Sequence, residues 1–154
     1  MRILSIDSST TSTGWCIYEN KPIKFGCICP NKTLEYIDRV IYILKELNAL
    51  KSKYKPEIII IEQLAVTRNA KVAQMLAGLQ VAIEVMFRQE EYLIVEARPS
   101  EWRKYCGIRG KKRQELKQNA VNYIMSKYKI EVNDDTAEAI CIAEYGNSLE
   151  VEQW

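Results

Sequence analysis

The segment MRILSIDSSTTSTGW, residues 1–15, decides how this chain is organised. Its largely apolar run, residues 3–6, has the pattern of a buried strand, and Asp7 follows directly at the end of that run. A buried carboxylate is costly unless a cation or hydrogen bonds offset its lost hydration. Two interpretations of Asp7 are therefore open. It is either a metal ligand or a turn residue that hydrogen-bonds the hydroxyl-rich stretch 8–13.

Length and composition predict a single domain, residues 1–154, without a membrane span. A chain of 154 residues that is 47% hydrophobic suffices for one core. The 5 cysteines are scattered and contain no C-x-x-C pair, which favours the reduced thiols of a cytoplasmic protein over disulfides or zinc ligands. Arg2 precedes only a short apolar run, and no later run approaches the ~20 residues of a spanning helix.

The complete absence of histidine narrows the possible chemistry. With 0 histidines, the chain cannot carry a Ser-His-Asp triad, a Cys-His pair or a histidine-based zinc site. Any catalysis must therefore use carboxylates, lysines, tyrosines, thiols, or a metal held by oxygen ligands.

The pattern of apolar and turn residues predicts an α/β fold, in which helices flank a central five-stranded mixed sheet. The first three strands are joined by short turns and are expected to be antiparallel, with a bulge at Gly26. The four consecutive isoleucines 58–61 indicate a parallel strand that is buried on both faces. The expected strands are residues 3–7, 14–18, 23–29, 57–62 and 92–95.

Helices are expected between and after these strands. Thr33 is the expected N-cap of the first helix, which ends near Lys53, and Asn69 is the expected N-cap of the second, from Ala70 to about Gln89. The second helix is apolar and rich in small residues, which is typical of a helix that is buried on two sides or lies at a dimer interface. The remaining expected helices are residues 99–105, 111–127 and one that begins near 133.

Further carboxylates lie at the end of a predicted strand and at the start of the last predicted helix. Glu62 ends the isoleucine strand, and ligands of open α/β sheets bind beyond the carboxyl ends of the strands. Asp134, Asp135 and Glu138 open the last helix, where acids also complement the helix dipole. Both Asp134 and Asp135 share a helix face with Glu138, so the spacing leaves open which of the two is a ligand.

Together these acids predict a metal site made only of oxygen ligands. If the last helix packs across the sheet, Asp7, Glu62, Asp135 and Glu138 converge. Such a site suits Mg²⁺, with Mn²⁺ as a substitute. Two such ions ~3.5–4 Å apart activate water and stabilise the leaving oxygen in phosphodiester hydrolysis.

Basic residues are concentrated in one segment of a chain whose net charge is only +2. Between residues 98 and 117 only Glu101 and Glu115 oppose them, which is the footprint expected of phosphate-backbone contacts, although a solvated surface has the same composition. The predicted DNA-binding residues are Arg103, Lys104, Arg109, Lys111, Lys112 and Arg113.

The order of these features resembles the RuvC-type Holliday junction resolvases of the ribonuclease H-like superfamily, above all their short phage and viral members. The residues that carry the resemblance are Asp7, Gly14-Trp15, Glu62-Gln63, and Asp135 with Glu138. The resemblance implies a ribonuclease H-like fold and a Mg²⁺-dependent endonuclease that resolves four-way or otherwise branched DNA by paired nicking. It also implies a homodimer, for which the helix from Ala70 to about Gln89 is the expected contact.

The resemblance also assigns roles to individual positions. Asp7, Glu62 and Asp135 match the metal-binding carboxylates of the family, and Glu138 matches a fourth acid that is usually Asp. Bacterial members carry an aromatic residue soon after the second acid that stacks on junction bases, whereas residues 64–66 here are Leu-Ala-Val.

Two other functions were weighed against this one. The stretch 7–14 also resembles the first phosphate loop of sugar kinases and actin-like ATPases, but those proteins need a second lobe and further loops, and this chain has only 154 residues and 6 glycines. A branched-DNA-binding module without catalysis is the other alternative, and the presence of all four acids disfavours it.

Overall fold

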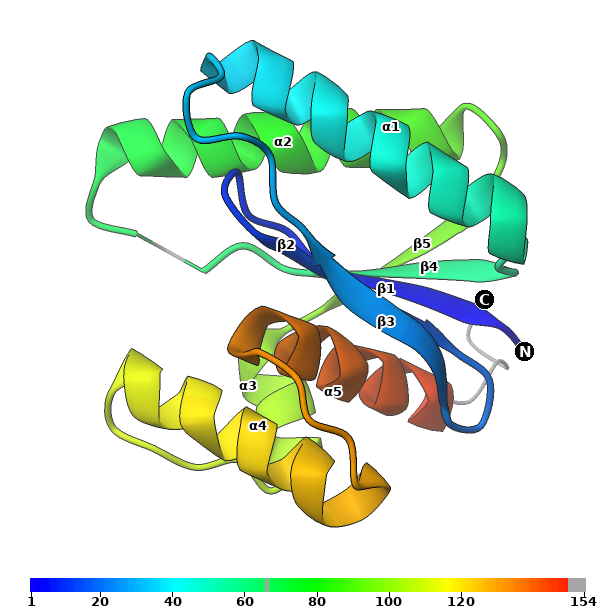
Figure 1. Ribbon diagram of the computed structural model, residues 1–154, viewed down its shortest axis with the longest axis vertical. Coiled ribbons are helices and arrows are strands. Elements are labelled where there is room, and N and C mark those ends of the chain that lie inside the picture. The colour runs from blue at the N-terminus through cyan, green and yellow to red at the C-terminus, as the bar shows by residue number, and fades with distance from the viewer. Residues whose placement is uncertain (66, 150–154) are drawn as a thin grey trace.

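A five-stranded mixed sheet with strand order β3-β2-β1-β4-β5 forms the centre of the computed structural model (Figure 1). The structure describes residues 1–65 and 67–149, so Val66 and the acids Glu150 and Glu152 lie outside the described residues. β1 pairs with β2, and β2 with β3, in antiparallel fashion, while β4 is parallel to both β1 and β5. The expected mixed sheet is confirmed. Its strands are β1 Ile3–Asp7, β2 Thr13–Tyr18, β3 Pro22–Ile28, β4 Ile58–Glu62 and β5 Leu93–Ala97.

Helices cover both faces of this sheet (Figure 1). α1 and α2 lie on one face, and α5 lies directly on the other, with α4 packed on its outer side. The short α3 follows β5 on the same side as α5. The helices are α1 Tyr36–Tyr54, α2 Ala70–Arg88, α3 Pro99–Tyr105, α4 Arg113–Tyr128 and α5 Asp134–Ser148.

The alternation of the strands divides the core into two layers. In β4, Ile58 and Ile60 pack with the apolar residues of α5, whereas Ile59 and Ile61 pack against α1 and α2. All four isoleucines are at most 4% exposed, so the prediction of a strand buried on both faces is confirmed. The layered core holds the ends of β1 and β4 side by side beneath the start of α5.

Several local predictions were wrong for identifiable reasons. α1 begins at Tyr36 after the N-cap Glu35, because the side chain of Asn31 accepts from both the backbone and the hydroxyl of Thr33 and so uses Thr33 in a turn. Gly26 is not a bulge. It pairs in register with Trp15, and the sheet becomes irregular only after two further pairs, between Ile17 and Tyr18.

The last two helices also begin at positions that their hydrogen bonds explain. α4 begins at Arg113 rather than Lys111, whose backbone N–H donates instead to the carboxylate of Glu115 at 2.9 Å. α5 has Asn133 as its N-cap, accepting from the N–H of Thr136 at 2.9 Å. The N-cap of α2 is Asn69, as predicted.

α2 has one buried face and one exposed face. Leu79, Ile83 and Phe87 are fully buried against the sheet, whereas Val81 and Val85 are 61% and 48% exposed. α2 is long and apolar enough to cross a membrane by length and composition alone, although it packs on the sheet through its buried face. Val72 is 43% exposed because the first turns of α2 reach past the sheet and line a cleft.

Candidate metal centre

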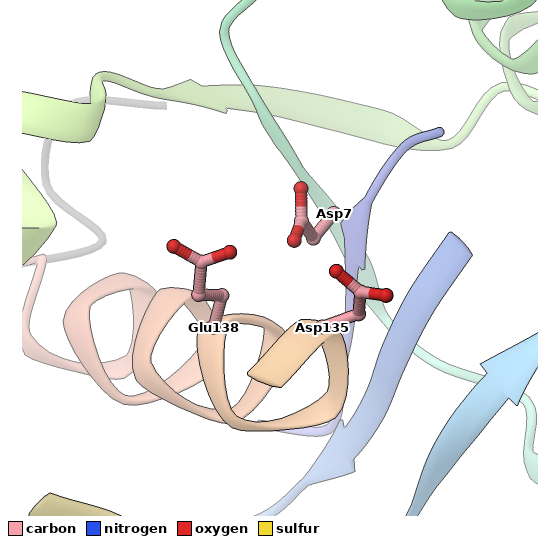
Figure 2. A group of neighbouring side chains, drawn as sticks. All are labelled: Asp7, Asp135 and Glu138. Carbon is pink, nitrogen blue, oxygen red and sulfur yellow. The ribbon is translucent and has the colours of Figure 1, made fainter. Parts of the chain in front are cut away.

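The ends of two parallel strands and the first turn of α5 bring carboxylates together. β1 ends at Asp7, and its parallel neighbour β4 ends at Glu62, so both acids stand at the same edge of the sheet. Figure 2 shows Asp135 and Glu138 on α5 pointing toward Asp7. One oxygen from each of these three carboxylates lies within 4.8 Å of the others. The structure thus brings together Asp7, Asp135 and Glu138, and places Glu62 next to them.

α5 is held on the sheet by polar contacts close to these acids. The hydroxyl of Ser5, on β1, is fully buried and donates to the backbone carbonyl of Ala139 at 2.6 Å. Asn133 caps the helix immediately before its acidic turn. A buried side chain that satisfies a helix carbonyl fixes the height and rotation of the helix over the strand. The positions of Asp135 and Glu138 therefore follow from packing within the core.

Glu62 is oriented by two residues of α3. The indole N–H of Trp102, a fully buried side chain, donates to Glu62 Oε1 at 2.9 Å. The guanidinium of Arg103 lies 3.9 Å from Glu62 Oε1 and 3.6 Å from Glu138 Oε1. Arg103 was predicted to bind DNA, and the structure places it against the acids at the side of the site. Partners of this kind orient ligating groups in metal sites.

Burial and mutual repulsion dominate the electrostatics of the acids. Burial, with the charges of Glu62, Glu138 and Asp135 added, raises the pKa of the Asp7 carboxyl well above its usual value. Burial also raises the pKa of Glu62, in part opposed by the hydrogen bond from Trp102. Burial and repulsion disfavour the charged form of these carboxylates, and a bound divalent ion would stabilise that charged form. The residues present therefore fit a hard metal ion.

A lysine stands among the acids, a placement that no sequence pattern indicates. Lys117 Nζ lies 2.7 Å from Asp135 Oδ1, 3.0 Å from Asp134 Oδ2 and 3.4 Å from Glu138 Oε2. Burial alone would lower the pKa of Lys117, but its hydrogen bonds to Asp135 and Asp134 and the charge of Glu138 outweigh that effect and raise it. In the sequence, Lys117 is the last residue of the basic segment 98–117. Its role depends on the packing of α4 against α5, which spacing along the chain does not reveal.

The two adjacent aspartates at the start of α5 have different environments. The side chain of Asp134 is 44% exposed and stands outside the group of three, whereas that of Asp135 is 20% exposed and faces Asp7. Of the two candidates that the spacing left open, Asp135 is the one that lies in the group with Asp7 and Glu138.

A cleft of about 1360 Å³ opens directly over the acids. One wall is the hydroxyl-rich stretch 8–12, and the other includes the loop after β4 and the first turns of α2. Thr13 keeps the hydroxyl-rich stretch folded by donating to the carbonyl of Ser9 at 2.6 Å. Ser8 and Ser9 thus line the space in front of Asp7. The cleft is large enough for a segment of polymer and has the acids at its base.

The predicted DNA-binding residues fall into two groups. Arg103 and Arg113 line the cleft. The others are exposed on α3 and on the connection from α3 to α4; they are Lys104, Arg109, Lys111 and Lys112. Two of the six basic residues predicted to bind DNA thus line the cleft that contains the acids.

Comparison with known proteins identifies the family. Residues 3–144 match the family model described as crossover junction endodeoxyribonuclease RuvC. The RuvC proteins of Caldicellulosiruptor saccharolyticus and Syntrophomonas wolfei are 27% and 26% identical to it, over 93% of this chain and 90% and 86% of theirs.

Solved structures agree on the fold at low sequence identity. Thermus thermophilus RuvC, solved in complex with a Holliday junction substrate, superposes with a TM-score of 0.76 at 14% identity, over 94% of this chain and 91% of that one. Fowlpox virus resolvase, solved with substrate Holliday junction DNA, gives a TM-score of 0.60 at 13% identity, over 97% and 100%. The match of the family model over most of the chain shows that this protein belongs to the RuvC family of crossover junction endodeoxyribonucleases.

Proposed function

We propose that this protein is a metal-dependent endonuclease that resolves four-way DNA junctions by nicking two opposed strands. The observation that carries the proposal is the convergence of Asp7, Asp135 and Glu138 at the base of a large open cleft, in a chain of the RuvC family. The basic residues beside the cleft provide the sequence-independent contacts that a DNA backbone requires. Relatives of known structure were solved with Holliday junctions, which supports the same substrate here.

The four acids are the proposed ligands. Asp7, Asp135 and Glu138 would hold one ion, and Asp7 with Glu62 a second, with Mg²⁺ as the proposed metal and Mn²⁺ as a substitute. When bound, the ions supply Lewis-acid activation of water and charge stabilisation at the leaving oxygen. The longer side chain of Glu138, where the family usually has Asp, reaches the group from the second turn of α5.

The remaining side chains position the acids and the DNA. Trp102 holds one oxygen of Glu62 in place through its indole N–H. Ser8 and Ser9 line the cleft in front of Asp7 and are placed to donate hydroxyl hydrogen bonds to a phosphate. Arg103 contacts both Glu62 and Glu138, and its positively charged guanidinium lines the cleft. We propose that Arg103, with Lys104, Arg109, Lys111, Lys112 and Arg113, contacts the DNA backbone.

We propose that the protein acts as a homodimer, joined through α2. Two opposed strands of a junction require two active sites, and a symmetric pair of chains provides them. The exposed apolar face of α2, with Val81 and Val85, is a suitable self-complementary contact. Ala77, an exposed small residue on the same helix, would allow two such helices to approach closely.

Two further features remain proposals about this chain. We propose that it is a single nuclease domain over residues 1–154, of the short type found in phages and viruses, in agreement with its lack of an aromatic residue at positions 64–66. We also propose that it acts in the cytoplasm, which agrees with 5 free cysteines, none of them paired among the described residues.

A nicking assay on a synthetic four-way junction tests the proposed activity. Wild type is expected to nick the junction in Mg²⁺ and to leave the matching linear duplex intact, while Asp7→Asn abolishes nicking but retains junction binding. Asp38→Asn, an exposed carboxylate on α1, is the matched control and should cleave like wild type. Junction binding without cleavage in Mg²⁺ or Mn²⁺ would instead favour the non-catalytic module. ATP hydrolysis without nicking would favour the actin-like alternative.

A further inference from the structure

Of the basic side chains that contact the acids, Lys117 makes the shortest contacts. The ammonium of Lys117 approaches Asp135 to 2.7 Å, Asp134 to 3.0 Å and Glu138 to 3.4 Å. Only 18% of its side chain is exposed. Two of its three partners, Asp135 and Glu138, also belong to the group with Asp7.

We propose that Lys117 is a tethered cation that occupies one cation position of the acidic site in the metal-free protein and competes with the metal for Asp135 and Glu138. The inference rests on the proposed function, since it takes these acids to be metal ligands. It assigns to Lys117 a positioning role: the lysine keeps the acids in place before metal binds and leaves when metal arrives.

Geometry and charge make the two cations mutually exclusive. Mg²⁺ binds carboxylate oxygens at about 2.0–2.1 Å and requires a nearly complete octahedral shell of oxygens. The ammonium of Lys117 already contacts one oxygen of each of these carboxylates, Oδ1 of Asp135 and Oε2 of Glu138. Two positive charges a few ångströms apart in a partly buried site also repel strongly. The metal therefore binds fully only after Lys117 has moved.

The structure provides a place for the displaced side chain. Lys117 lies on α4 one turn after Arg113, and both residues line the cleft. Asp134, its more exposed partner, stands at the outer side of the site with 44% of its side chain exposed. A rotation of the flexible lysine stem would keep the ammonium near Asp134 while releasing Asp135. The charge would then face the space where a DNA phosphate is proposed to lie.

Arg103 serves as the comparison within the same site. Its guanidinium is 3.6 Å from Glu138 and 3.9 Å from Glu62, longer than any contact of Lys117 with the acids. Arg103 therefore contacts Glu62 and Glu138 more loosely than Lys117 contacts Asp135. Competition with a metal is expected to be stronger for Lys117.

Metal affinity of the DNA-free protein provides the first test. A site that is open for only ~10% of the time binds about tenfold more weakly than one that is always open. Lys117→Gln is thus expected to bind Mn²⁺ about tenfold more tightly than wild type in calorimetric titration. Lys45→Gln removes the same charge from an exposed side chain of α1 that makes no ion pair among the described residues, and it should bind Mn²⁺ like wild type.

A second measurement uses only the wild-type protein, and so does not depend on the folding of a variant. Acetylation of Lys117 by an amine-reactive reagent, followed by mass spectrometry, is expected to be slow in EDTA and several-fold faster when Mg²⁺ saturates the site. Acetylation of Lys45, exposed on α1, provides the internal reference and should not change. The expected increase reports release of the ammonium directly, without any activity assay.

The outcomes separate this inference from the proposed function. If Lys117→Gln binds Mn²⁺ no more tightly than wild type, or if Mg²⁺ does not accelerate acetylation of Lys117, the competition is disproved while the nuclease proposal stands. If wild type and Lys117→Gln both fail to bind Mn²⁺, the metal centre itself is disproved, and the inference falls with it.

Discussion

Gly14 on β2 and the backbone carbonyl of Asp135 on α5 are in such close contact that a Cβ atom on Gly14 would lie 2.1 Å from the carbonyl oxygen. Gly14 is also the antiparallel partner of Asp7 in the sheet. The start of α5 therefore rests directly on the strand position next to Asp7. The separation of the Asp7 and Asp135 carboxylates depends on the absence of a side chain at residue 14.

Gly14→Ala is accordingly expected to destabilise the protein and to separate the acids. The added methyl group would meet backbone atoms, which cannot move aside as a flexible side chain does, so the free energy of unfolding should fall by about 3 kcal/mol or more. Urea unfolding measures this. Gly26→Ala is the control, because its Cβ would meet only the Trp15 side chain, at 3.3 Å. A Gly14→Ala protein with wild-type stability would show that α5 is not seated in this way.

Asp7→Asn is expected to stabilise the metal-free protein near neutral pH. The pKa of Asp7 is raised by burial and by Glu62, Glu138 and Asp135, so the folded state binds more protons than the unfolded state once the pH exceeds about 4. The free energy of unfolding of wild type should therefore decrease as the pH rises through the folded-state pKa. The neutral amide lacks this loss, and a gain of about 1 kcal/mol is expected.

Urea unfolding in EDTA at several pH values measures this effect. The difference in stability between Asp7→Asn and wild type should shrink toward about pH 4, where the wild-type carboxyl is increasingly protonated in both states. A variant that is less stable than wild type at neutral pH would show that Asp7 is not electrostatically strained in the metal-free site.

The basic segment between α3 and α4 is expected to contribute to DNA affinity through phosphate contacts. Changing Lys111, Lys112 and Arg113 together to alanine should weaken junction binding and reduce the slope of log K against log salt by roughly two to three. A matched triple change at Lys45, Lys53 and Lys55, on α1 and at its end, removes the same charge away from the cleft and should leave the slope unchanged. Equal slopes for both triple variants would identify the basic segment as ordinary solvated surface.

The proposed dimer contact on α2 predicts the effect of a single charge. Val81 is 61% exposed at the middle of the apolar face, so Val81→Glu would bury a carboxylate in the interface and should shift the protein to a monomer. Sedimentation velocity measures the shift. Met125→Glu introduces the same charge at a residue that is 40% exposed on α4, across the sheet, and should not alter the assembly. A Val81→Glu dimer would place the contact elsewhere.

The fold was predictable because its signals are local and strong. The four isoleucines of β4 have the pattern of a strand covered on both faces, and the short turns of β1–β3 admit only antiparallel pairing. Glu62 could be placed beside Asp7 because parallel strands end at the same edge. The prediction that Thr33 caps the first helix was wrong because Asn31 forms a turn with Thr33 instead. Both the cap and the turn involve only residues close together in the chain, so the sequence does not show which of them forms.

The contacts between helices were not predictable in the same way. Lys117 is 18 residues from Asp135 along the chain, and only the packing of α4 on α5 turns a member of a basic segment into a cation among the acids. The placement of Trp102 against Glu62 likewise depends on how α3 leaves β5. Such contacts follow from tertiary packing, for which a single sequence carries no periodic signal.

The most direct test of the proposed metal centre is a crystal structure of the protein with Mn²⁺ bound, using the anomalous signal of the ion. The account predicts an anomalous peak in contact with carboxylate oxygens of Asp7, Asp135 and Glu138, and no such peak in crystals of Asp7→Asn. A peak away from these residues, or none at a Mn²⁺ concentration that supports nicking in solution, would contradict it.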